Sequence, residues 1–168
     1  MLSKNMKFHH SITENGNLQL RIITEYQDDK GNFIDHKYSD PMTPIDPGHM
    51  ADWDDRSKDI VAAITNKDTL AAFAIEKKEP TGTGLEEIVT YDRVLDDFGR
   101  IAVRRITRIF DEGEEVSKKF HRTWINPGDD PDRADVMSKA IAEKLHTPEV
   151  VAAYQAKQQE DTAMEITT

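Results

Sequence analysis

The chain has 168 residues and a formal net charge of −10, with an isoelectric point near 5.0. This acidity argues against nucleic acid as the main ligand, because binding to phosphates needs a basic surface. Apolar residues make up 37% and charged residues 32% of the chain, which predicts a folded protein with thin cores. The absence of cysteine excludes disulfides, thiolate metal sites and a cysteine nucleophile.

The hydropathy pattern predicts neither a membrane span nor a signal peptide. No apolar run approaches the roughly 18 residues that a spanning helix needs, and the start MLSKNMKFHH has no apolar signal-peptide core. We therefore expect a soluble intracellular product without a membrane partner.

The first half reads as three strands followed by two helices. A strand over residues 7–13 leads into an Asn-Gly turn at 15–16, which is a strong hairpin signal. Apolar residues alternate with polar ones from Leu18 onward and predict a second strand. A polar turn at 28–32 precedes a third strand, which ends before Pro41 because proline cannot donate to a strand ladder. Two helices follow.

The second half shows the same order of elements. A strand over 88–95, a turn with Phe98-Gly99 and an arginine-rich strand precede an acidic turn at 111–114. The third strand runs on to Ile125, and two helices close the unit. Thr147-Pro148 marks the start of the last helix, with threonine as the N-cap and proline at the first helical position; Asn66 takes the cap position in the first half.

The two halves align collinearly. Residues 14–26 match 96–109 in their glycine, arginine and apolar positions, and an Ala-Ala-aromatic triplet at 71–73 matches one at 152–154. We therefore predict an α+β fold that is a tandem repeat of two modules, each a three-stranded antiparallel β-meander followed by two short helices.

The predicted boundaries follow from this alignment. They place module 1 at 1–78, a linker at 79–85, module 2 at 86–158 and a flexible tail at 159–168. Domains under about 80 residues are marginally stable alone, so we expect the modules to pack on each other or on a partner.

An acidic loop is the only weak candidate for a metal site. Hard cations need several oxygen ligands close together, and the candidates are Asp129, Asp130, Asp132 and Asp135. The loop lacks the glycine and glutamate of an EF-hand. The favoured interpretation is that Asp130 or Asp132 caps the following helix while the other carboxylates are solvated.

No catalytic motif is present. None of the six histidines forms an HExxH pattern, and no serine lies in a GxSxG turn. We expect no catalytic residues and no cofactor, and the chain is predicted not to be an enzyme.

An arginine-rich strand is the one local basic feature. Arg100, Arg104 and Arg108 share one face of the strand, and Arg105 lies on the other. Cross-strand pairing with acidic residues of the next strand, Asp111, Glu114 or Glu115, is the favoured interpretation. The alternative is a basic face that binds a partner, which the global charge favours as a protein.

The large apolar residues are predicted first as core and second as interface residues. They are Trp53, Trp124, Met50, Met137 and Phe120.

The second half resembles a module of small tailed-bacteriophage proteins encoded near virion and tail genes. The likeness rests on the strings RITR at 105–108, DEGE at 111–114, FHR at 120–122, NPGDD at 126–130 and HTPEVVAAYQ at 146–155. It covers residues 99–157 and, through the repeat, 16–73 more weakly. In the first half Ser39-Asp40 replaces the His-Arg pair and Asn66-Lys67 replaces Thr-Pro.

The resemblance implies a non-enzymatic structural or assembly protein of the virion, associated with tail, neck or capsid and acting by protein–protein docking. Its partners would be other virion proteins or further copies of itself, and its location the virion, assembled in the host cytoplasm. The residues expected to make contact are Arg104, Arg108, His121, Arg122, Trp124 and Tyr154. Two alternatives stay open: a module that engages a host protein during infection, and a metal-dependent enzyme that uses the acidic loop 129–135.

Overall fold

The computed structural model describes residues 3–39 and 53–166, with side chains described as far as residue 162. Strands β1 (Ser3–Ile12), β2 (Leu18–Gln27) and β3 (Phe33–Tyr38) precede helices α1 (Asp55–Thr65) and α2 (Lys67–Glu76). Strands β4 (Leu85–Leu95), β5 (Ile101–Asp111) and β6 (Glu114–Ile125) follow, then the 3-10 turn η2 (Pro131–Arg133) and helices α3 (Val136–Leu145) and α4 (Pro148–Ile166). No helix among these residues is long and apolar enough to cross a membrane.

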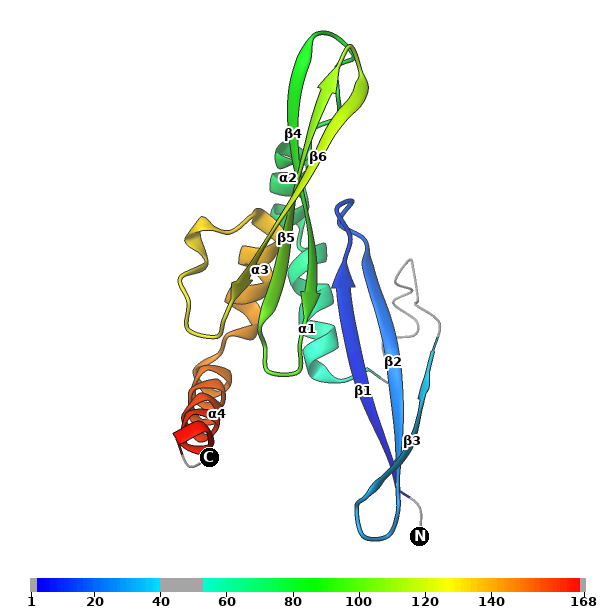
Figure 1. Cartoon of the computed structure of the whole chain (residues 1–168), viewed down its shortest axis with the longest axis vertical. Helices are drawn as coiled ribbons and strands as arrows, with labels where there is room; N and C mark the ends of the chain where they lie inside the picture. Colours follow the sequence, from blue (N-terminus) through cyan, green and yellow to red (C-terminus); the bar gives the residue numbers. More distant parts are fainter. Residues whose placement is uncertain (1–2, 40–52, 167–168) are drawn as a thin grey trace.

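All the strands listed above form one antiparallel sheet in the order β3-β2-β1-β4-β5-β6 (Figure 1). The join between the two halves is the pairing of β1 with β4, in which His10 opposes Leu95, Ser11 opposes Val94 and Ile12 opposes Arg93. The prediction of two modules with separate three-stranded sheets is therefore wrong, because one sheet runs through both ranges 1–78 and 86–158.

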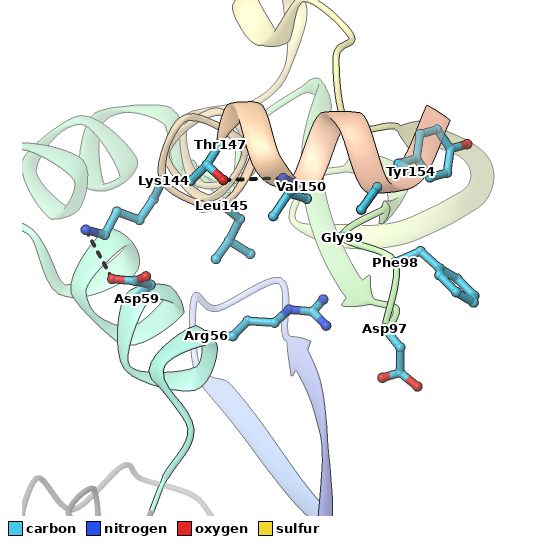
Figure 2. A pocket seen from close by; sticks show the side chains of 11 residues that line it. Arg56, Asp59, Asp97, Phe98, Gly99, Lys144, Leu145, Thr147, Val150 and Tyr154 are labelled. Carbon is cyan, nitrogen blue, oxygen red and sulfur yellow. Dashed lines mark hydrogen bonds and ion pairs between the residues drawn. The ribbon is translucent and has the colours of Figure 1, made fainter. Parts of the chain in front are cut away.

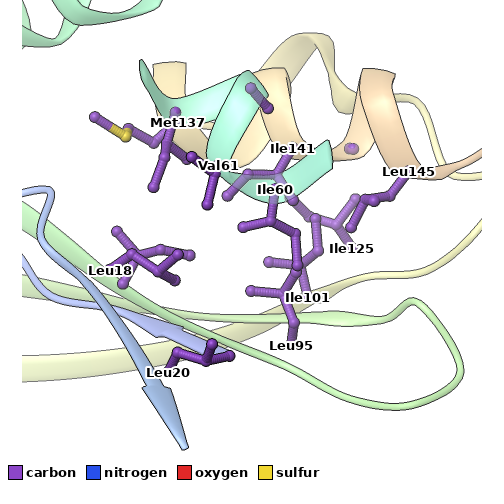
Figure 3. Packing of buried hydrophobic residues seen from close by; sticks show 14 of the residues in the cluster. Leu18, Leu20, Ile60, Val61, Leu95, Ile101, Ile125, Met137, Ile141 and Leu145 are labelled. Atoms are coloured by element: carbon purple, nitrogen blue, oxygen red, sulfur yellow. The ribbon is translucent and has the colours of Figure 1, made fainter. Parts of the chain in front are cut away.

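The hydrophobic core is also shared by the two halves (Figure 3). Leu18 and Leu20 from β2 lie in one buried cluster with Ile101 from β5, and Ile60 from α1 and Ile141 from α3 cover them. The physical reason is size: a half of about 80 residues buries too little apolar surface alone. Pairing β1 with β4 also removes two exposed strand edges.

The turn between β1 and β2 packs against helices of both halves. Gly16 has a φ of +78°, and an added Cβ would lie 2.9 Å from the ring of Phe73 and 3.2 Å from the side chain of Met137. Only glycine fits such a close approach in a left-handed conformation. The turn therefore ties the first hairpin to α2 and α3.

Predicted caps and core residues are partly confirmed. Asn66 Oδ1 accepts a hydrogen bond from the Asp68 amide at 2.9 Å, and Thr147 Oγ1 accepts one from the Val150 amide at 3.4 Å, as predicted. Trp53 and Met137 are buried, but Phe120 and Trp124 are 56% and 52% exposed, so their placement in the core is wrong. Met50 lies outside the described residues. Helix α4 continues to Ile166, so residues 159–166, expected in a flexible tail, are helical.

Two buried polar contacts join the central strands to the helices. Arg93 of β4 donates from Nε to Asp135 Oδ1 and to Ser138 Oγ, both at 3.0 Å, at the start of α3. His10 of β1 places Nε2 2.8 Å from Ser57 Oγ in α1. Both basic side chains are buried, so water cannot replace their partners in α3 and α1. These contacts therefore fix the positions of the two helices on the sheet.

The Arg93 contact predicts a large loss of stability on Arg93→Met. The substitution leaves the Asp135 carboxylate buried without its cation, which typically costs about 3–5 kcal/mol. Urea unfolding at pH 7 measures the loss, and Arg93→Met combined with Asp135→Asn should recover part of it. A loss below about 1 kcal/mol would contradict the structural role given to this pair.

His10 predicts a loss of stability in mild acid. Burial lowers the pKa of His10 to about 4, and Nδ1 has no hydrogen-bond partner among the described residues. Between the ordinary histidine pKa of about 6.5 and the lowered pKa in the folded chain, His10 is protonated in the unfolded chain but stays neutral in the folded chain. The free energy of unfolding should therefore fall by about 3 kcal/mol between pH 6.5 and 4 through this group. Urea unfolding across this range tests it, with His10→Gln as the non-titrating control; equal pH dependence in both proteins would contradict the assignment.

Candidate functional site

One face of the sheet is the candidate functional site. The core cluster and α1 and α3 lie against the other face, behind the strands in Figure 1. Cross-strand register places a second set of side chains together on the opposite side, around a shallow hollow of about 730 Å³. We call this surface the open face, and it consists of Asp92 and Val94 from β4, Ala102, Arg104, Ile106 and Arg108 from β5, and Lys118, Phe120, Arg122 and Trp124 from β6.

Exposed aromatic rings stand on the open face and are each covered by a cation. The guanidinium carbon of Arg100 lies 4.7 Å from the ring centre of Trp124, and that of Arg104 lies 5.3 Å from the ring centre of Phe120. Such contacts are worth about 0.5–1 kcal/mol at exposed sites. They hold the two rings in defined orientations without burying them.

Arg104 is neutralised within the molecule. Its Nε donates to both carboxylate oxygens of Asp92 on β4, at 3.1 and 3.0 Å. The hydrogen bond from Arg104 to Asp92 raises the pKa of the guanidinium further. The predicted pairing with Asp111, Glu114 or Glu115 of the next strand is wrong for Arg104, because its cross-strand partner is Asp92 on β4.

Arg108 connects four segments of the chain. Its guanidinium donates to Thr90 Oγ1 of β4 at 2.8 Å, lies 3.1 Å from the carboxylate of Glu115 of β6, and donates to Glu14 Oε1 in the β1–β2 turn at 2.9 Å. The side chain is only 12% exposed. Arg108 is therefore a structural tie, and it confirms the predicted pairing with Glu115.

The contact with Arg108 also lowers the pKa of the Glu14 carboxyl. Burial acts to raise the pKa of its carboxyl, but hydrogen bonds from Thr90 and Arg108 and the charge of Arg108 outweigh it and hold the pKa below its ordinary value. Thr90 Oγ1 donates to Glu14 Oε2 at 2.8 Å. The carboxylate thus stays ionised and closes the network.

Two cations of the open face are left without a carboxylate. Lys118 and Arg122 face Arg108 and Arg104 across the β5–β6 register, and neither forms an ion pair with any residue in 3–39 or 53–166. Lys118 Nζ lies 5.6 Å from the ring centre of Phe120. The charges available to a partner therefore lie beside β6, not at the centre of the face.

The other two predicted contact residues lie elsewhere. His121 faces the helix side of β6 opposite Arg105, where both line a cavity of about 380 Å³ with Tyr91. Tyr154 of α4 donates from its hydroxyl to Asn126 Oδ1 at 3.1 Å. Of the six predicted residues, the fold brings together Arg104, Arg108, Arg122 and Trp124.

The acidic loop 129–135 does not converge on one point. Asp129 accepts from the Asn126 amide at 2.7 Å, Asp130 caps η2 through the Asp132 amide at 3.0 Å, and Asp132 accepts from Lys139 at 2.8 Å. Asp135 is buried against Arg93 and caps α3, a role that we had predicted for Asp130 or Asp132. No cluster of three or more potential metal ligands is found among the described residues.

A second cavity, of about 330 Å³, lies between α1, the β4–β5 turn and the start of α4 (Figure 2). Its apolar wall includes Phe98, Leu145 and Val150, and Arg56 points toward it. Burial lowers the pKa of Arg56, but nearby carboxylates, Asp97 first, oppose this effect. Because these carboxylates already balance the cation, this cavity offers no net charge to a ligand.

Sequence reasoning missed Asp92, Glu14 and Lys118 in this site. Asp92 lies directly opposite Arg104 in the β4–β5 register, so alternation within β4 was the signal that could have found it. Lys118 shares the period-two pattern of Phe120 and Arg122. Glu14 comes from a turn that packs against the other half, and no local pattern points to that contact.

Comparison with known proteins adds no relative. No protein-family model, no curated protein and no solved structure matches the chain. The properties of the site therefore rest on its own residues.

Arg108 and Arg122 test whether the cations of the open face divide into those that stabilise the fold and those that are available to a partner. Arg108→Gln should lower the free energy of unfolding by about 1–3 kcal/mol, because it leaves Glu14 and Glu115 without their charged donor. Arg122→Gln, on the same face, should change it by no more than about 0.5 kcal/mol. Urea unfolding of both variants measures the difference, and equal effects would contradict the division into structural and available cations.

Proposed function

We propose that the chain is a non-enzymatic docking protein that binds a partner protein through the open face of its sheet. The observation that carries this proposal is the pair of half-exposed rings, Phe120 and Trp124, each oriented by an arginine on a face without a helix in the described part of the chain. Tryptophan, other aromatics and arginine are enriched among the residues that dominate binding energy at protein interfaces.

The charge of the open face favours protein over nucleic acid. Arg104 and Arg108 already have carboxylate partners, and the whole chain carries −10. A ligand with one phosphate per nucleotide would meet few free cations there and a repulsive field beyond it. Mixed charges around aromatic rings suit a protein surface of complementary pattern.

We further propose that the partner belongs to a tailed-phage particle or its assembly pathway. This part of the proposal is supported by the resemblance of residues 99–157 to phage modules, whose FHR string contributes Phe120 and Arg122 to the open face. The partner would then be another virion protein or a further copy of the chain, and the chain would be a component of the assembled virion.

Phe120→Ser combined with Trp124→Ser tests the docking role. Both rings are half-exposed, so stability should change little, while incorporation of the chain into purified particles of the encoding phage should fall at least tenfold by quantitative mass spectrometry. The matched control is Leu70→Ser with Ile75→Ser, which removes two exposed apolar side chains of α2.

Two results would contradict the proposal. Undiminished incorporation of the Phe120→Ser, Trp124→Ser variant would show that the open face is not the docking surface. Absence of the wild-type chain from purified particles would remove the virion role and favour engagement of a host protein.

A further inference from the structure

The strand next to the free cations is also an edge of the sheet. β6 ends the strand order, spans Glu114–Ile125, and has mostly exposed side chains. An edge strand presents a row of backbone N–H and C=O groups that can pair with another extended chain. Twelve residues is long for an edge; the opposite edge, β3, has six.

The charges of the β6 side chains indicate which kind of extended segment could pair with this edge. Lys118, Lys119 and Arg122 form no ion pair with a carboxylate of the described residues, although the charge of Lys118 helps to lower the pKa of Glu14. Glu115, in contrast, is held by Arg108 at 3.1 Å. The part of β6 from Lys118 to Arg122 is therefore basic, although the strand begins with Glu114 and Glu115 and the chain as a whole carries −10.

A second copy of β6 is a poor match for this edge. Antiparallel pairing of two copies centred on Phe120 would set Lys118 opposite Arg122, and like charges directly opposite one another are destabilising. A register that sets Glu114 and Glu115 opposite Lys119 and Lys118 would pair only half of the strand. Lysines on an edge strand are a common protection against such self-pairing. Charge complementarity instead favours an acidic strand.

We propose that an acidic, extended segment of the partner protein adds to the sheet along β6 and places carboxylates over Lys118 and Arg122. This inference rests on the proposed docking function and names the chemistry of the docked segment. Since Lys118, Phe120, Arg122 and Trp124 alternate along one face, acidic residues four positions apart on the segment would meet the two cations. An apolar residue between them would meet Phe120, and a second one, beyond the acidic residue that meets Arg122, would meet Trp124.

The probe for this proposal is a nine-residue peptide, TETVTETVT, acetylated and amidated at its ends. Titration of the full chain should show saturable binding, with protection from hydrogen exchange at alternate backbone amides of β6. Lys118→Glu combined with Arg122→Glu should weaken binding at least tenfold. The matched control, Lys4→Glu with Lys37→Glu, makes the same change in net charge on exposed residues of β1 and β3 and should bind as the wild type does.

Each other outcome overturns the inference in a distinguishable way. If the acidic peptide does not bind at millimolar concentration, or if the TKTVTKTVT peptide binds equally well, the proposal that an acidic segment binds along β6 is wrong. Binding without protection of β6 amides means contact through the open face alone, so the docking function stands and strand addition fails. If the β6 amides are protected from hydrogen exchange without any peptide, and sedimentation shows dimers, then β6 pairs with a second copy of the chain and the proposal of an acidic partner segment is wrong.

Discussion

The buried contact of Arg93 with Asp135 and Ser138 is the interaction on which the arrangement depends. A guanidinium taken out of water must be matched by fixed acceptors, and both acceptors here lie at the first turn of α3. His10 and Ser57 make the corresponding contact between β1 and α1. Because β1 and β4 are paired at these positions, the two contacts place both helices on one face of the sheet. The helices, the shared core and the open face are all consequences of that placement.

A sheet face that no helix of the described residues covers has to be compatible with water, and the charge network on the open face provides this compatibility. Arg104 lies at the level between the two aromatic rings and Arg108 lies beyond Phe120. The two arginines are balanced by Asp92, Glu14 and Glu115. The balance keeps the face polar without giving it a large net charge. It also links β1–β2 to β4–β6 at a place where the strands themselves share only three residue pairs. Within this network Arg108 and Glu14 therefore stabilise the join between the halves, while Arg104 separates the rings that a partner would contact.

The sequence predicts the individual strands, turns and helix caps of this fold, but it does not predict how the strands pair into one sheet. Asn66 and Thr147 are caps because short polar side chains satisfy free amides at helix starts, a local rule. The pairing of β1 with β4 has no local signal, since alternation specifies the face of a strand but not its neighbour. For the site, alternation correctly predicted that Arg104 and Arg108 share one face. Phe120 and Trp124 were wrongly predicted as core residues because they were assigned by their size and apolar character, not by alternation. Their period-two spacing with Lys118 and Arg122 was the better indicator.

The two ends of the sheet are unequal, and this bears on how the chain can associate. β3 has six residues and pairs with β2 through a register shift at Tyr26/Gln27, whereas β6 has twelve. Joining β3 of one copy to β6 of the next would leave half of β6 unpaired and would repeat head to tail, as a ring or an open filament. Joining β6 to β6 about Phe120 would set Lys118 opposite Arg122, which carry like charges. A strand from a different, acidic chain avoids both difficulties, which is why we propose a segment of another protein, not a second copy, as the occupant of this edge.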